Sequence, residues 1–224
     1  MRRTRLDAEL VRRGLARSRE QATALVTSGR VSVGGRVAAK PATAVESGAP
    51  IVIRDEQTAP TYASRGGHKL AGALDALGPA GPAVEGRRCL DAGASTGGFT
   101  DVLLRRGAAH VVAVDVGYGQ LAWTLRNDPR VSVLERTNVR ELTSAQVGTP
   151  VGLTVADLSF ISLRLVLPAL RRCAAPDADH LLMVKPQFEV GRERLGAGGV
   201  VRDPQLRAAA VLDIAAAAAE HGLG

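Results

Sequence analysis

The segment Cys89–Asp101, CLDAGASTGGFTD, constrains the fold more than any other part of the chain. A short apolar run leads into Asp91 and a glycine-rich bend, and apolar residues then recur at helical spacing from Phe99. This pattern is typical of a ligand site at the carboxyl end of a parallel sheet, because glycine permits close backbone approach and a helix N-terminus has unpaired N–H groups. An ordinary tight turn between a strand and a helix is the simpler alternative.

The acidic residue in this bend indicates the charge of the ligand. The bend has neither the GxGxxG nor the GxxxxGK[ST] spacing of phosphate-binding loops, and Asp91 would repel a phosphate. A zwitterionic or cationic ligand fits better. S-adenosylmethionine, with its amino group and sulfonium, is the leading candidate.

Strands and helices alternate beyond the bend. Predicted strands cover 88–91, 110–115, 131–135, 152–158 and 180–185, and predicted helices cover 98–107, 118–127, 139–147, 162–174 and 205–220. Near-continuous apolar strands separated by helices predict a doubly wound parallel sheet with helices on both faces. The fold class is therefore α/β.

Polar residues collect where these predicted strands end. Asp91, Asp115, Asp157 and Lys185 each end a strand, and Asn138 follows another. One such residue is often a structural cap, but charged residues on four strands predict a shared crevice. We expect Asp115 near a ribose diol and Asn138 near an adenine edge.

Basic residues are concentrated at the N-terminus. Ten Lys and Arg against three acids fall between Met1 and Lys40, so this segment carries the whole net charge of +7. Such a concentration is typical of a phosphate-binding face, and a solvated basic face without a partner is the alternative. The segment predicts two short helices and a small hairpin, in a module of about 55 residues.

The composition excludes several other classes of protein. Residues 1–10 lack the apolar stretch of a signal peptide, and no apolar run is long enough to span a bilayer, so we expect a cytoplasmic protein without a membrane partner. The two cysteines are far apart, which indicates a reducing compartment. The four histidines lack ligand spacing, so we expect no metal.

The N-terminal module resembles the S4 RNA-binding domain through Arg5-Leu6-Asp7, Gly14-Leu15, Ser18-Arg19 and Lys40-Pro41. The resemblance implies binding to structured RNA, largely by shape and backbone. The implied RNA-binding residues are Arg5, Arg12, Arg13, Arg17, Arg19 and Arg36.

The remainder resembles the methyltransferase half of the TlyA family, which is similar to FtsJ-type ribose methyltransferases. The matching motifs are SRGGHKL, LDAGASTGGFTD, VVAVDVGYGQL, ERTNVREL, DLSFISL, VKPQFE and GGVVRDP. The resemblance implies a small α+β S4 domain at 1–54, a linker at 55–64 and a Rossmann-like methyltransferase domain at 65–224. It also implies methylation of a ribose 2'-hydroxyl, of a cytidine in rRNA, on a ribosomal subunit. The oligomeric state, a monomer or a weak dimer, is left open by the sequence.

The family's Lys-Asp-Lys-Glu tetrad is carried over only in part. Lys69 matches the first lysine, Asp157 the aspartate and Lys185 the second lysine, and the glutamate has no match. The simplest interpretation is a fragment that lacks its C-terminal strands. Expected cofactor residues are Asp91, Gly93, Ala94, Ser95, Gly97, Gly98, Phe99, Asp115, Asn138, Val139 and Asp157.

Lys185 is expected to be the general base, if desolvation and the charge of Lys69 disfavour its protonation while Asp157 orients it. Two other functions stay open. One is a non-catalytic RNA-binding or ribosome-assembly protein, which the missing glutamate favours. The other is a membrane-lytic protein, in keeping with the haemolysin label of the family, although no amphipathic or apolar membrane segment is evident.

Overall fold

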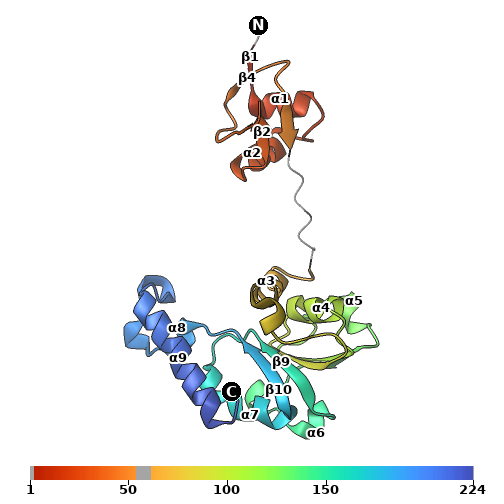
Figure 1. Cartoon of the computed structure of the whole chain (residues 1–224), viewed down its shortest axis with the longest axis vertical. Coiled ribbons are helices and arrows are strands. Elements are labelled where there is room, and N and C mark those ends of the chain that lie inside the picture. The colour runs from red at the N-terminus through yellow and green to blue at the C-terminus, as the bar shows by residue number, and fades with distance from the viewer. Residues whose placement is uncertain (1–2, 54–61, 224) are drawn as a thin grey trace. The chain divides into compact units, whose positions relative to one another are not determined.

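The computed structural model describes residues 3–53 and 62–223 (Figure 1). The chain divides into two compact units, Met1–Thr61 and Tyr62–Gly224. Each unit has hydrophobic clusters of its own, one in the first and two in the second.

The first unit combines two helices with two small antiparallel sheets. Ser18 begins the second helix by accepting a hydrogen bond from the Gln21 N–H, 3.1 Å away. The predicted helices and hairpin are present, and the sequence analysis missed only the pairing of β1 with β4, since RTR in β1 has no apolar pattern. The elements are β1 (Arg3–Arg5), α1 (Leu6–Arg12), α2 (Arg19–Thr27), β2 (Val31–Val33), β3 (Arg36–Val37), β4 (Ala44–Glu46) and β5 (Ile51–Ile53).

Two buried carboxylates on α1 fix arginines of the first unit. Glu9 accepts hydrogen bonds from Arg12 (2.5 and 2.7 Å) and from Arg13 (2.8 Å). Asp7 accepts from Arg5 (2.8 and 3.1 Å) and from Arg19 (3.1 Å). The hydrogen bonds from Arg12 and then Arg13 lower the pKa of Glu9 to about 2. The α1 helix is therefore held in place by ionised groups as well as by apolar packing.

The second unit is built on a five-stranded sheet in the order β10-β9-β6-β7-β8. Every neighbouring pair is parallel, which confirms the predicted α/β sheet. The chain order reverses between β6 and β9, and ligands bind at such a switch point in parallel sheets. The strands are β6 (Arg88–Ala92), β7 (His110–Val114), β8 (Val131–Leu134), β9 (Val151–Ala156) and β10 (Ala174–Leu182).

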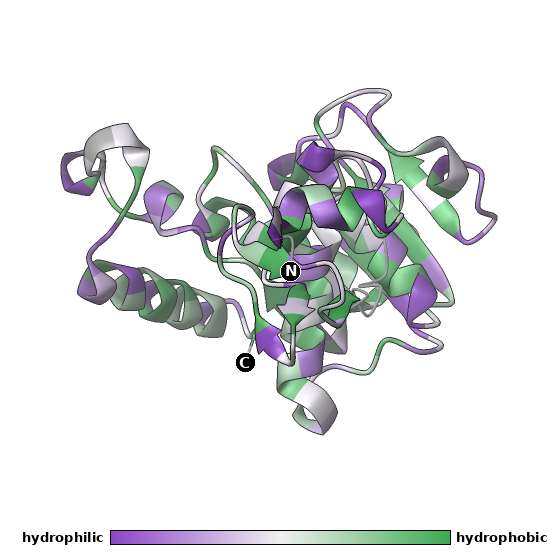
Figure 2. Cartoon of the chain, turned by 90° about the horizontal axis from the view of Figure 1, so that it is seen from above, coloured by the Kyte–Doolittle hydropathy of each residue, from purple (hydrophilic) through white to green (hydrophobic). Residues whose placement is uncertain are grey.

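Helices cover both faces of this sheet (Figure 1). One face packs on α3 (Gly67–Leu77), α4 (Gly98–Arg105) and α5 (Trp123–Arg126). The other packs on α6 (Ser144–Val147), α7 (Leu167–Cys173) and α9 (Pro204–Glu220). Figure 2 shows hydrophobic and hydrophilic residues on the helices, with hydrophobic residues along much of α9. The remaining short elements are α8 (Pro186–Glu189), η1 (Gly78–Ala80), η2 (Val139–Glu141), η3 (Leu163–Leu165), η4 (Arg192–Arg194) and η5 (Ala197–Gly199).

Three predicted helices are shorter than expected. The segment 118–127 is helical only from Trp123, because Gly117 and Gly119 lie in a turn before it. The segment 139–147 breaks at Leu142, and a capping box at Thr143 starts a new helix. The segment 162–174 begins with a 3₁₀ turn before α7. Strand β10 begins earlier than predicted, at Ala174, with an irregular register up to Asp179.

Part of the predicted linker packs against the second unit. The Ala63 N–H donates to Asp101 on α4 at 2.8 Å, and the Tyr62 ring lies 5.1 Å from the Arg105 guanidinium. Tyr62 also packs against the apolar cluster beside α3 and α4. The rest of the predicted linker, 55–61, lies outside the described residues. Within the described ranges, no helix is long and apolar enough to cross a bilayer.

The Glu9 cluster predicts acid sensitivity of the first unit. Because the pKa of Glu9 is lowered from 4.5 to about 2, its stabilisation is complete above pH 4.5 and is lost as the pH falls towards 2. We expect Glu9→Gln to lower the melting temperature of this unit by about 5 °C at pH 7, with a difference that shrinks in acid. NMR signals of residues 3–53 during thermal unfolding measure this. Glu20→Gln, on the exposed face of α2, is the control, and equal melting of all three proteins at pH 7 would contradict the prediction.

Candidate active site

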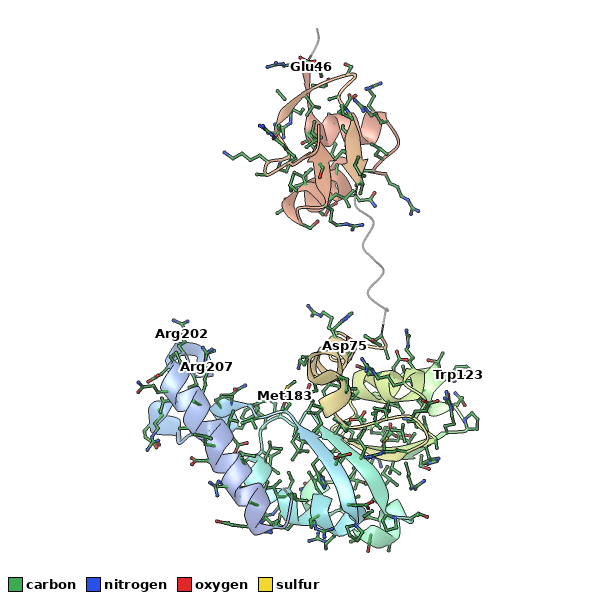
Figure 3. The ribbon with its side chains drawn as sticks, in the orientation of Figure 1. Glu46, Asp75, Trp123, Met183, Arg202 and Arg207 are labelled. Carbon is green, nitrogen blue, oxygen red and sulfur yellow. The ribbon has the colours of Figure 1, made fainter. Side chains whose placement is uncertain are left out.

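Backbone pairing brings the ends of the central strands together. The Asp157 N–H donates to Ala92 O (3.2 Å), so the segment after β9 stays beside β6. The Met183 N–H donates to Ala156 O (2.9 Å), and Figure 3 labels Met183 near the end of β10. Asp157 and Lys185 therefore follow two neighbouring strands, one and two residues beyond the backbone hydrogen bond between Ala156 and Met183.

Glycine is required at the switch point itself. Gly93 has φ 89°, and a Cβ there would lie 2.9 Å from Asp157 O. Gly97, with φ 98°, faces the Leu125 side chain, and a Cβ on Gly98 would lie 2.7 Å from Gly67 N. These last two glycines thus allow the helices to pack closely, whereas the sequence pattern predicted close approach of a ligand.

A first pocket of about 520 Å³ lies over the ends of β6, β7 and β9. The predicted cofactor residues Gly93, Ser95, Asp115, Asn138, Val139 and Asp157 line it. Its other walls are mostly apolar side chains, among them Val116, Leu158 and Ile161. Apolar walls with a few convergent polar groups are typical of small-molecule sites.

Asp115 and Asn138 are held by backbone groups. Asp115 Oδ2 accepts from the Ser95 N–H (2.8 Å) and Oδ1 from the Gly117 N–H (2.7 Å). Asn138 Oδ1 accepts from the Arg140 N–H at 3.1 Å. The carboxylate keeps further lone pairs and the amide keeps its N–H donors, so both side chains can still bind a ligand.

A second pocket of about 270 Å³ adjoins the first and shares Gly93, Ser95, Asp157 and Ser159 with it. Its lining also includes predicted residues from both classes, namely Lys69, Ala94, Gly98, Phe99 and Lys185. The predicted catalytic residues and all the predicted cofactor residues except Asp91 and Gly97 therefore line two adjoining pockets, which together form one crevice.

One carboxylate in this crevice contacts two lysine side chains. Asp157 Oδ2 accepts from Lys69 Nζ at 2.8 Å, and Asp157 Oδ1 lies 2.6 Å from Lys185 Nζ. The Lys69 side chain is 49% exposed, whereas Asp157 and Lys185 are 16% and 17% exposed. Burial raises the pKa of Asp157, but the hydrogen bonds from Lys185 and Lys69 and their charges outweigh it, so the net shift is downward. This ion pair explains why a lysine lies in the first turn of α3, where the helix dipole disfavours a cation.

Asp91 was expected to line the cofactor site, but it does not. It lies inside β6, is fully buried and lines neither pocket of the crevice. Its Oδ2 accepts from Thr100 Oγ1 at 2.6 Å, and its Oδ1 has no hydrogen-bond partner among the described residues. Burial raises the pKa of Asp91 to about 7, the Thr100 hydrogen bonds oppose the rise, and Asp115 and Asp157 add to it. Asp91 therefore lies beneath the crevice and is not part of its lining.

Several residues that line the crevice were not predicted from the sequence. Ser159, Gln120, Thr137 and Phe160 lie in motifs that were recognised, but no rule of spacing singled them out. Phe160 has φ 64°, is 92% exposed and lies 5.4 Å from the Phe188 ring, centroid to centroid. A strained backbone at a bulky residue is typical of functional sites.

Glu189 does not take the place of the missing glutamate. It accepts from Ser162 Oγ (2.5 Å) and from the Leu163 N–H (2.9 Å), and so it caps η3. No glutamate of the described residues lines the pocket with the two lysines. That part of the chain also holds no cluster of His, Cys, Asp and Glu that could bind a metal ion.

The six predicted RNA-binding arginines fall into two groups. Arg5, Arg12, Arg13 and Arg19 pair with Asp7 or Glu9, and Arg13 also donates to the carbonyls of Ser47 and Ala49. Arg17 and Arg36 are exposed, and no acidic partner is described for either side chain. The Arg13 side chain is 22% exposed, so its contacts are mainly structural.

Comparison with known proteins separates the same two units. Residues 62–224 match the model of the FtsJ-like methyltransferase family, and residues 4–51 match the S4 domain. The 16S/23S rRNA (cytidine-2'-O)-methyltransferase TlyA of Mycobacterium tuberculosis is 64% identical, over 99% of this chain and 81% of its own.

Two further relatives carry a different name. Hemolysin A of Brachyspira hyodysenteriae is 36% identical, over 91% of this chain and 82% of its own. A solved structure of a Streptococcus thermophilus protein, assigned as a hemolysin, is 38% identical, covers 99% of this chain and 80% of its own, and has a TM-score of 0.70. The chain therefore belongs to the TlyA family of FtsJ-like methyltransferases with an N-terminal S4 domain.

Proposed function

We propose that this protein transfers a methyl group from S-adenosylmethionine to the ribose 2'-hydroxyl of a cytidine in rRNA, in the cytoplasm. The observation that carries the proposal is the Lys69-Asp157-Lys185 cluster beside a pocket suited to a nucleoside. The family and the named activity of the relative from M. tuberculosis support the same reaction.

The residues of the first pocket fit S-adenosylmethionine. Asp115 offers carboxylate oxygens to a ribose diol, Asn138 offers amide groups to an adenine edge, and apolar side chains provide walls for the base. Asp115 lies just beyond the end of β7 and lines this pocket, and Asp91 lies beneath it within β6, so two carboxyl groups favour a ligand with positive charge here. When bound, the cofactor supplies an activated methyl group on a sulfonium.

Lys185 is the general base in this proposal. A ribose hydroxyl is a very weak acid and must lose its proton as it attacks, so a base within hydrogen-bond reach lowers the barrier. Lys185 Nζ in its neutral form takes this proton, and Asp157 fixes the position of the amine. Lys69, which is half exposed at the crevice, binds the same carboxylate from the other side and holds it in place. Alignment of the hydroxyl with the methyl group supplies much of the remaining rate.

The first unit is proposed to bind the rRNA. Residues 1–40 of this unit carry the whole net charge of the chain, and Arg17 and Arg36 are exposed and can contact phosphates. The exposed Phe160 ring at the rim of the crevice offers a surface on which an unstacked base can stack.

The base assignment predicts a selective loss of chemistry. Lys185→Ala should abolish methyl transfer to rRNA from tritiated S-adenosylmethionine while leaving the affinity for the cofactor close to normal, because Lys185 lines the second pocket and not the first. Calorimetry measures the affinity. Turnover near the wild-type rate in Lys185→Ala would show that another group takes the proton.

The close approach at Gly93 predicts a selective loss of cofactor binding. Gly93→Ala places a methyl group 2.9 Å from Asp157 O and should weaken S-adenosylmethionine binding at least about tenfold, as expected when strand ends are forced apart at a binding crevice. Gly86→Ala introduces similar backbone strain at φ 71° but meets no atom within 4 Å, and it should leave the affinity unchanged. Equal affinities of the two variants, measured by calorimetry, would contradict this account.

The two groups of arginines predict two different phenotypes. Replacing Arg17 and Arg36 together by glutamine should reduce the slope of log affinity against log salt by about two, one per phosphate contact, without changing the melting temperature.

Arg13→Gln should instead destabilise the first unit, because it breaks contacts to Glu9 and to two carbonyls. Filter binding of rRNA over a salt series measures the slope of the double variant, and the melting temperature measures the destabilisation by Arg13→Gln. An unchanged slope in the double variant would exclude these arginines as phosphate contacts.

A further inference from the structure

Lys185 is held by a second acceptor besides Asp157. Lys185 Nζ donates a hydrogen bond to Ser159 Oγ at 2.8 Å, in addition to the contact of 2.6 Å with Asp157 Oδ1. Both acceptors come from the segment that follows β9, two residues apart in the chain. The Lys185 side chain is 17% exposed, so water has limited access to the amine. Ser159 lines the same pocket as Lys69, Asp157 and Lys185.

The number of acceptors matters because of the shape of the amine. A neutral primary amine has two N–H groups and one lone pair, arranged roughly tetrahedrally. Ser159 Oγ accepts one N–H group, and the amine also lies at ion-pair distance from Asp157 Oδ1. With the Asp157 contact alone, the amine could rotate about its Cε–Nζ bond and carry the lone pair away from the substrate. The hydrogen bond to Ser159 therefore limits this rotation and the direction in which the base can accept a proton.

We propose that Ser159 is a positioning residue, which orients the Lys185 lone pair toward the ribose 2'-hydroxyl; this inference rests on the proposed function. In this step the hydroxyl oxygen would gain the methyl group as the bond between that methyl carbon and the sulfonium sulfur breaks and a thioether is left; the hydroxyl proton would pass to Lys185 Nζ, and Ser159 would neither gain nor lose a proton. A serine hydroxyl suits this role because it accepts a hydrogen bond without adding a second negative charge beside the amine.

A nearby serine provides a matched control. Ser162 Oγ accepts from the Arg164 N–H (3.2 Å) and donates to Glu189 (2.5 Å), so it caps η3 and does not contact Lys185. Ser159 and Ser162 lie on the same connection between β9 and α7. Removal of either hydroxyl perturbs this connection, but only removal of the Ser159 hydroxyl frees the amine.

The kinetic test compares Ser159→Ala, Ser159→Thr and Ser162→Ala in the full chain, with tritiated S-adenosylmethionine and rRNA. We expect Ser159→Ala to lower kcat about tenfold, as the loss of one orienting hydrogen bond allows, with KM for both substrates unchanged. Ser159→Thr keeps the hydroxyl and should recover most of kcat, and Ser162→Ala should stay near the wild-type value. An increase in KM for either substrate without a fall in kcat, or equal losses in Ser159→Ala and Ser162→Ala, would overturn the proposal.

A spectroscopic measurement tests the hydrogen bond apart from catalysis. Lysine side-chain Nζ–H signals of ¹⁵N-labelled protein are assigned with Lys185→Arg. We expect slow exchange of the Lys185 Nζ–H with water in the wild type and in Ser162→Ala, and fast exchange in Ser159→Ala. A Lys185 signal that is unaffected in Ser159→Ala would exclude the positioning role. If the wild type shows this signal but methylates no rRNA, the proposed function fails while the contact between Ser159 and Lys185 stands.

Discussion

The site depends on one carboxylate that contacts two lysine side chains. Asp157 lies between Lys69 from α3 and Lys185, which follows β10. Asp157 and Lys69 are 88 residues apart in the chain, so this contact joins distant segments. The parallel pairing of β9 with β6 and β10 places Asp157 there, and Gly93 keeps the neighbouring strand end close enough. The sheet thus supplies the positions, and the ion pairs fix the side chains.

The carboxyl groups at the crevice differ in how strongly their surroundings favour ionisation. Asp157 is lowered in pKa by its two lysines, whereas burial raises the pKa of Asp91 to about 7. Burial thus disfavours the ionised form of Asp91, and a cation bound above it would favour that form. The first unit uses buried carboxylates differently, because Asp7 and Glu9 each bind two arginines and stay ionised. The surrounding cations decide which of these carboxylates stay charged.

Much of the fold was predictable from the sequence. The β6 to β10 strands are apolar runs that end in polar residues, and the S4 pattern is local in sequence. The helix boundaries were less predictable, because a single capping box at Thr143 or the glycines before Trp123 decide them. Lys69, Asp157 and Lys185 were identified by resemblance to the family, and the role of each stays a proposal. Ser159 could not be identified, since its importance depends on a distance to Lys185 across two strands. The burial of Asp91 was missed because the strand runs one residue further than its pattern indicates.

The central claim is that this crevice directs a methyl group to a ribose oxygen. Mass-spectrometric mapping of rRNA incubated with the protein and S-adenosylmethionine tests this claim most directly, because it distinguishes a methylated ribose from a methylated base. The account predicts new methylation on the 2'-oxygen of a cytidine, at a discrete position. Methylation on a base atom, or rRNA without any newly methylated ribose, would contradict it.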